Sequence, residues 1–307
     1  MSAKSDLLTR LKYLSEAVNE PFLIDAGVLP STHNGIANLL RKGLGIVAFN
    51  IIEDYIKSRS EEGLTFISNS GISFTNLTDT LQKSSTIGAL KSLIFNSNYL
   101  KKDPSFDVRN LIQTEAYKIY STKTHPFSLS KYSLAYSGSN VSTEEIPDLL
   151  KSFGINNGWA RLKSISDAIG GGIPDLLSSF QNASQRRHNA AHNVNFNYIH
   201  SWLTNIKSEI LAIAASIDIA LTAKCRQVSR SPSSAIDILD IAGDLNFRFI
   251  EAASSTQFKE KKGFIGKTIK NWPTLSDAIA HNQPKLNKKK EFLIVLNSSG
   301  RIIDWYT

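Results

Sequence analysis

The segment Arg187-His-Asn-Ala-Ala-His192 places an arginine and a histidine close together, with four residues between them. A guanidinium is a permanent cation that binds phosphate oxygens in bidentate fashion, and an imidazole exchanges a proton near neutral pH. This pair suits phosphodiester cleavage, in which Arg187 would stabilise the extra negative charge on phosphorus and His192 would transfer a proton. His188 and Asn189 lie between them and are further candidates for the same site.

Within one helix, Arg187 and His192 do not point in the same direction. A helix turns by roughly 100° per residue, so these two side chains lie about 140° apart. A two-fold dimer that packs this helix against its mate would bring both pairs into one cleft. One His192 would take the proton of a ribose 2′-OH, and the other, or a water, would protonate the leaving 5′-oxygen. Because DNA has no 2′-OH, the substrate of this mechanism is RNA.

A metal site is a competing interpretation of the same segment. His188 and His192 share a helix face, but zinc needs at least three protein ligands. Asn189 stands where a His-Glu-x-x-His zinc protease carries its glutamate. The single cysteine, Cys225, excludes an intrachain disulfide and a cysteine zinc site. We therefore predict no metal ligands and no cofactor.

A purely structural interpretation also fits the spacing. Arg187 lies on an apolar row of its helix and could be a core arginine paired with Glu53. His192 could be a residue at the helix C-terminus that interacts favourably with the helix dipole. The spacing alone does not separate this interpretation from the catalytic one.

Amphipathic helices must position these residues. The motif helix is predicted to have Pro174 at its first position, where the missing N–H costs nothing. A longer helix is predicted over 34–58, and Asn50 and Glu53 continue one row of its apolar surface, where polar groups need partners when buried. The stripe predicted to face the core consists of Ile36, Leu39, Leu40, Gly43, Ile46, Val47 and Ile51.

The rest of the first 228 residues is predicted to be largely helical. Residues 1–27 indicate a polar helix followed by an extended stretch, and 123–127 and 136–140 are typical of loops or turns. Apolar spacing and end signals predict further helices over 78–94, 106–120, 143–153, 158–168 and 198–226.

Composition bounds the class of protein. The chain has 307 residues, 41% of them hydrophobic, and a net charge of +8. No run approaches the roughly 18 uninterrupted apolar residues of a spanning helix, and the N-terminus lacks an apolar signal core. We expect a soluble cytoplasmic protein with no membrane partner. The moderate positive charge permits binding to a polyanion without requiring it.

The sequence pattern changes after residue 228, from long helical spacing to short helix and strand signals. We predict a helical domain over 1–228 with its core at about 30–225, a linker at 229–234, and a small α/β domain of unknown role over 235–307. Its predicted elements are short helices over 235–243 and 274–280, a strand from 247, and a hairpin over 292–306. Its lysines, including Lys261, Lys262 and 288–290, are either solvated loop charge or a phosphate-tracking surface.

The motif resembles the Arg-Asn-x-x-x-His signature of the HEPN superfamily (higher eukaryotes and prokaryotes nucleotide-binding), with His188 in place of the asparagine. The segment 38–55 is similar to the first core helix of the RNase L-like (RiboL-PSP) subgroup, which closes on Leu-Glu-x-Tyr; Glu53 and Tyr55 match, and Ile52 replaces the leucine. Residues 138–154 are similar to the middle segment of that subgroup. The resemblance spans roughly 30–225.

The resemblance implies a mainly α fold, a HEPN-like helical bundle that dimerises through its motif helices and acts as a metal-independent endoribonuclease in toxin–antitoxin or antiviral defence systems. By analogy, Arg187 and His192 are the catalytic pair and Glu53 orients Arg187. The implied partners are RNA, a second copy of the chain, and an antitoxin or defence-system protein. Candidate RNA-binding residues are Arg186, Asn50, Lys261 and Lys262.

Two other function classes stay open. The chain could be a non-catalytic HEPN-like module that binds RNA, a nucleotide or a partner protein. It could also be a DNA-processing effector that acts through its C-terminal part, an interpretation that depends only on the lysines there. Retention of both Arg187 and His192 favours the ribonuclease.

Overall fold

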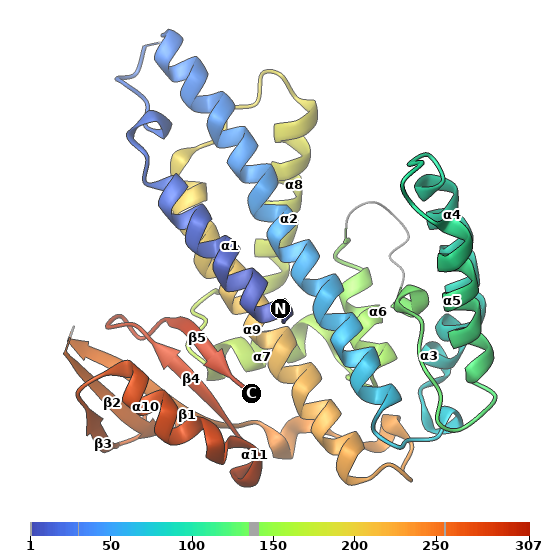
Figure 1. The fold of residues 1–307 in the computed structure, drawn as a ribbon. Coiled ribbons are helices and arrows are strands. Elements are labelled where there is room, and N and C mark those ends of the chain that lie inside the picture. The colour runs from blue at the N-terminus through green and yellow to red at the C-terminus, as the bar shows by residue number, and fades with distance from the viewer. Residues whose placement is uncertain (1, 30, 135–140, 255) are drawn as a thin grey trace. The chain divides into compact units, whose positions relative to one another are not determined.

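The computed structural model describes residues 2–29, 31–134, 141–254 and 256–307. The chain is mainly helical and ends in a small sheet with its own helices (Figure 1). This confirms the predicted fold class. The Cα positions group the chain into two compact units: unit 1 contains 1–57, 162–219 and 245–307, and unit 2 contains 58–161 and 220–244. The predicted boundary at 229–234 stays a prediction.

The helices that contribute to unit 1 include the longest in the chain. The helix predicted over 158–168 has the predicted bounds, whereas the one predicted over 34–58 begins earlier and ends ten residues later, at Ser68. These helices are α1 (Ala3–Val18), α2 (Thr32–Ser68), α7 (Gly158–Ala168), α8 (Leu176–His192) and α9 (His200–Arg230), with a short 3₁₀ turn at Pro21–Leu23.

Unit 2 is built from shorter helices. Its elements are α3 (Asp79–Lys83), a π-helical turn (Ser84–Gly88), α4 (Ala89–Leu100), α5 (Val108–Ser121) and α6 (Glu145–Ser152), with 3₁₀ turns at Phe74–Asn76, Lys131–Leu134, Ile236–Ile238 and Ile241–Asp244. The buried Lys224 donates to the carbonyls of Ile236 (3.1 Å) and Leu239, which holds the segment after α9. Burial lowers the pKa of Lys224 to about 8. The predicted loop at 136–140 lies outside the described residues.

The apolar stripe predicted on α2 is largely wrong as a core-facing surface, although its last member, Ile51, is buried. Ile36, Leu39, Leu40 and Val47 are exposed, with 44–69% of each residue accessible. The buried face of the first half of α2 carries Ala37, Arg41, Ala48 and Phe49. The physical reason is that α2 is apolar on more than one side, so the 3.6-residue pattern does not select which side packs.

By length and composition, α2 is apolar enough to cross a membrane. A helix at the centre of a helical bundle passes the same test, so this feature is weak evidence for a membrane. Within the protein, α2 carries the buried Arg41 and Glu53, which are 1% and 4% exposed.

The C-terminal sheet has the strand order β3-β2-β1-β4-β5, in which β1 and β4 are parallel and the other neighbours are antiparallel. The predicted hairpin corresponds to its last two strands. The elements are β1 (Asn246–Ser254), β2 (Gln257–Lys262), β3 (Thr268–Trp272), α10 (Leu275–Asn282), a 3₁₀ turn (Gln283–Lys285), α11 (Leu286–Lys289), β4 (Glu291–Leu296) and β5 (Ile302–Tyr306).

The two faces of this sheet have different neighbours within unit 1. On one face, Ile250, Trp272 and Leu293 form a core with Ala278 of α10 and Leu286 of α11. On the other, the Trp305 indole donates to Asp218 of α9 at 2.6 Å. At the β5 edge, Lys4 of α1 pairs with Asp304 (2.7 Å), and the Ile302 amide donates to the Gly170 carbonyl (3.2 Å). The sheet is therefore fixed to α1, α9 and the turn after α7.

Candidate active site

The motif helix α8 begins and ends with defined caps. Asp175 is the N-cap, and its carboxylate accepts from the Ser178 amide (3.1 Å) and hydroxyl (2.7 Å). These hydrogen bonds lower the pKa of Asp175. The prediction of Pro174 as first helical residue is wrong: α8 begins at Leu176, because the side chain of Asp175 supplies the cap one residue after the proline. His192 is the last helical residue.

The motif residues divide between the solvent and the interior. His188 and His192 are both exposed, and the centres of their rings lie 4.8 Å apart. Arg187 is half-buried, and its Nε is buried without a hydrogen-bond partner among the described residues. Asn189 is half-buried, and its side chain accepts from Gln185 at 3.3 Å. The structure thus brings two imidazoles together and, on the same helix, leaves the Arg187 Nε without a hydrogen-bond partner among the described residues.

Arg186 precedes the motif and is engaged by the protein. Its guanidinium carbon lies 4.6 Å from the ring centre of Trp202, a cation–π geometry. Glu209 of α9 is half-buried, and burial raises its pKa, an effect that the charge of Arg186 partly opposes. Burial also raises the pKa of Tyr198 to about 12. Arg186 therefore links α8 to α9, and its role in RNA binding stays a prediction.

Three polar residues of α2 hold the loop that follows the motif; we call them the α2 clamp (Asn38, Arg41 and Lys42). The Lys42 ammonium donates to the carbonyls of Asn193 and Val194, both at 2.9 Å. These carbonyls come directly after His192, so Lys42 fixes the C-terminal end of the motif helix.

The other two members of the α2 clamp form hydrogen bonds with the part of the loop that leads into α9. Asn38 donates to the Phe196 carbonyl (3.1 Å) and accepts from the Tyr198 amide (2.8 Å). Arg41 is 1% exposed and donates to the carbonyls of Tyr198 (2.6 Å) and Leu23 (2.7 Å). It also pairs with the half-exposed Asp25 at 3.0 Å. The α2 clamp thereby supplies donors to four carbonyls of this loop, at Asn193, Val194, Phe196 and Tyr198.

Close packing of α2 against this loop requires a glycine. A Cβ at Gly45 would lie 2.3 Å from the ring of Tyr198, closer than real Cβ contacts allow. Further along, Phe49 of α2 and Phe180 of α8 have their ring centres 5.4 Å apart. These contacts set the distance between α2 and the motif helix.

The remaining predicted site residues lie in three environments. Glu53 is buried on α2, and its role in orienting Arg187 stays a prediction. Asn50 is half-buried on the same helix. Lys261 and Lys262 lie on β2 of the C-terminal sheet; Lys261 forms an ion pair with Glu251 of β1, and Lys262 is exposed.

The arrangement supplies proton-transfer groups and an anion-binding group. Two adjacent imidazoles can move protons, and a guanidinium such as that of Arg187 is of the type that binds phosphate oxygens. Across the described ranges of the chain, no group of three or more His, Cys, Asp or Glu side chains is placed to hold a metal ion.

Sequence reasoning missed the α2 clamp, Trp202 and Glu209. The only sequence signal for the clamp was three polar residues inside an otherwise apolar helix. Their partners lie about 150 residues further along the chain, so spacing within the helix carried no information about them.

Comparison with known families supplies the assignment. The family model described as RiboL-PSP-HEPN matches residues 5–223. The chain belongs to the RiboL-PSP HEPN family. HEPN domains are often ribonucleases or RNA-binding modules, and they commonly dimerise. No curated protein and no solved structure matches this HEPN chain.

Proposed function

We propose that this HEPN protein is a metal-independent endoribonuclease that acts as a homodimer. The observation that carries the proposal is the pair of exposed, neighbouring imidazoles, His188 and His192, in the last turn of the helix that also carries Arg187. We further propose that it is a cytoplasmic toxin or antiviral effector with a neutralising protein partner, as in other systems of this kind.

The chemistry needs groups from both protomers. His192 of one protomer removes the proton of a ribose 2′-OH, and the 2′-oxygen attacks the adjacent phosphorus. The bond from phosphorus to the 5′-oxygen breaks, and the partner's His192, or a water, protonates that oxygen. Arg187 binds the phosphoryl oxygens as negative charge accumulates. The products are a 2′,3′-cyclic phosphate and a free 5′-OH.

An exposed apolar row supports the dimer. Ile36, Leu40, Gly43 and Val47 of α2, which we call the α2 seam, recur at spacings of four, three and four residues, and all four are exposed. Nothing lies within 4 Å of a Cβ placed at Gly43, so a second helix can approach closely there. Apolar rows of this kind on a helix surface are typical of helix–helix interfaces.

Cleavage of labelled single-stranded RNA in EDTA tests the proposal. We expect wild-type protein to leave 2′,3′-cyclic phosphate ends, and His192→Ala and Arg187→Ala to be inactive while folded. His125→Ala, which removes an exposed histidine of unit 2, is the matched control and should keep full activity. Activity that needs a divalent metal, or that persists in His192→Ala, would contradict the mechanism.

A non-catalytic RNA-binding module is the second candidate, favoured by the departure of His188 from the family's asparagine. The same assay separates the two, because such a module would bind the labelled RNA and leave it intact.

A further inference from the structure

Nearly all the net charge of the protein lies in one short segment of the C-terminal sheet. Residues 256–290 contain nine lysines and two acidic residues, a net charge of 9 − 2 = +7, and the whole chain has +8. The other residues, including the whole HEPN bundle, therefore sum to +1. This segment comprises β2, β3, α10 and α11 (Figure 1).

Four of these cationic or titratable side chains converge at one edge of the sheet; we call them the basic corner (Lys270, His281, Lys285 and Lys289). The Lys270 ammonium lies 3.7 Å from the ring centre of Trp272. The ring of Trp272 in turn lies 4.9 Å from that of His281. The Lys285 ammonium is 2.6 Å from Nε2 of His281.

The charge of the basic corner is not neutralised by the protein. Glu260, the acid that faces it from β2, is buried, and its carboxylate already accepts from Arg248, Trp272 and Asn282. Asp277, one turn before His281 on α10, accepts from the hydroxyl of Thr274.

The pKa of His281 is lowered, in agreement with an excess of positive charge around it. Desolvation lowers it most, followed by the charges of Lys285 and Lys270, and Lys289 acts in the same direction. Only Glu260 opposes these effects. An imidazole that resists protonation beside three ammonium groups indicates a positive potential that a phosphate would relieve.

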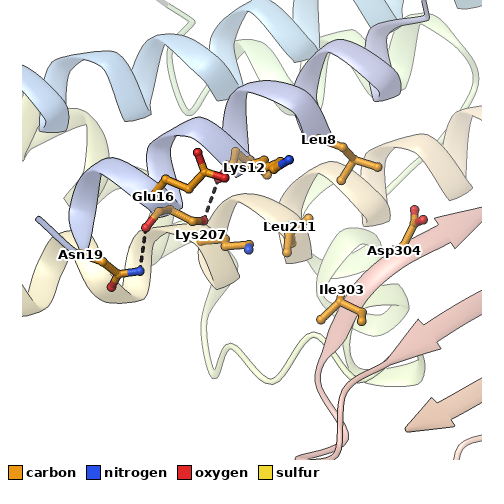
Figure 2. Close-up of a pocket in the computed structure, with 10 residues that line it drawn as sticks. Leu8, Lys12, Glu16, Asn19, Lys207, Leu211, Ile303 and Asp304 are labelled. Carbon is orange, nitrogen blue, oxygen red and sulfur yellow. Dashed lines mark hydrogen bonds between the residues drawn. The ribbon is translucent and has the colours of Figure 1, made fainter. Parts of the chain in front are cut away.

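Two lysines elsewhere in unit 1 differ from those of the basic corner because acidic side chains lie near them. Lys12 and Lys207 line a pocket of about 420 Å³ between α1, α9 and β5, drawn in Figure 2. Glu16 and Asp304 line the same pocket, so its positive and negative charges are equal in number. Lysines alone therefore do not distinguish the basic corner; the missing counter-charge does.

We propose that the basic corner binds the phosphodiester backbone of a nucleic acid strand and holds RNA for the HEPN site. The inference rests on the proposed ribonuclease function for the identity of the strand. Contacts to phosphates carry no sequence information and raise the local concentration of substrate. The corner lies on β3, α10, the 3₁₀ turn and α11, whereas β5, four strand spacings from β3, contacts the bundle. At about 4.8 Å per spacing, roughly 19 Å of sheet separate the corner from β5. β5 contacts the Gly170 turn before α8, and the 17 residues from Leu176 to His192 span roughly another 25 Å at 1.5 Å per residue. An RNA strand that reaches from the corner to the HEPN site must span both the sheet and this helix.

The test uses full-length protein carrying His192→Ala, so that bound RNA is not cut, and labelled RNA and DNA strands of the same sequence. Lys270→Gln/Lys289→Gln should weaken binding of both strands about tenfold and reduce the slope of log K against log salt by about 1.4, since each neutralised phosphate contributes roughly 0.7. Lys12→Gln/Lys207→Gln, which removes the same charge at the pocket of Figure 2, should leave the affinity and the slope unchanged.

Three results would overturn the proposal: unchanged binding in the corner variant, equal weakening in both variants, or corner-dependent binding to phosphatidylserine vesicles without corner-dependent binding to either strand. Lys270→Arg/Lys289→Arg keeps the charge and should bind like the parent, which guards against a folding defect in the glutamine variant.

The outcome is separable from that of the proposed function. If wild-type protein fails to cleave RNA and the corner variant still loses affinity, the binding surface stands and the ribonuclease does not. If wild-type protein cleaves RNA and the corner variant binds normally, the ribonuclease function stands and the binding surface does not.

Discussion

Near the motif of the HEPN bundle, Arg41, Lys42 and Arg186 are each engaged by the protein itself, through carbonyls or an aromatic ring. In the C-terminal sheet, Lys270 and Lys289 have no ion-pair partner among the described residues. These three cations of the bundle thus position the site, and Lys270 and Lys289 of the basic corner are available to a ligand. The comparison teaches that net charge and catalytic geometry are carried by different parts of this chain, and substitutions should affect them separately.

The largest expected effect is a loss of turnover when His192 of the helical bundle is replaced. His192→Ala should lower kcat by about 10²–10⁴, the usual contribution of a general acid or base, with RNA affinity retained. Lys270→Gln/Lys289→Gln should do the opposite, raising KM for a long strand and leaving cleavage of a dinucleotide unchanged. Single-turnover and steady-state kinetics on both substrates measure the split. A fall of kcat in the lysine variant would break the comparison.

Dimer formation should depend on the α2 seam. Leu40→Asp/Val47→Asp should give a monomer, because each buried aliphatic side chain contributes about 1.5–3 kcal/mol and charge opposes the contact. Light scattering coupled to size exclusion measures the mass, and cleavage should be lost with the dimer. Tyr117→Asp alters an exposed residue of unit 2, 71% accessible against 44% for Leu40 and 46% for Val47, and should stay dimeric. A monomeric wild-type protein that cleaves RNA would contradict the shared site.

The α2 clamp should matter for stability as well as activity. Arg41→Ala leaves the carbonyls of Leu23 and Tyr198 without their donor, at a cost of about 2–4 kcal/mol in the free energy of unfolding. Urea unfolding measures this cost. The salt dependence of RNA binding should not change, because Arg41 is buried. An altered salt slope would show that the cations of the bundle also contact the strand.

The smallest effect concerns Glu209. Burial raises its pKa above 4.5, so the folded protein binds this proton more tightly than the unfolded chain does. The resulting cost to stability is absent at low pH and grows as the pH rises from 4.5 through the raised pKa. Glu209→Gln should therefore be more stabilising near neutral pH than near pH 4, as followed by thermal unfolding at both. Equal effects at both pH values would contradict the assignment.

Helices and hairpins that are bounded by turn residues next to them in the sequence were predicted correctly. The helix α7 is preceded by a glycine-containing turn and followed by three glycines, and its bounds were predicted. The β4–β5 hairpin was predicted because two apolar runs flank Asn-Ser-Ser-Gly, a turn sequence. Each of these signals lies within a few residues of the element that it defines.

Features that depend on distant partners were not predictable. The strand β2 has three lysines among its six residues, a residue type depleted in strands, and pairing with β1 and β3 and cover from α10 stabilise it. Which apolar face of α2 stays exposed depends on which of its faces packs against the neighbouring helices, and those helices are distant in the sequence. The α2 clamp exists only because the loop after the motif returns to α2.

Lys4 of α1 meets Trp305 and Asp304 across 301 positions of sequence. During synthesis, at roughly 5–20 residues per second, about 15–60 s separate the emergence of α1 from that of β5. Throughout that interval, Lys4 lacks its partners in β5. Non-local closure of this kind slows folding, so nascent chains should depend on chaperones at this stage.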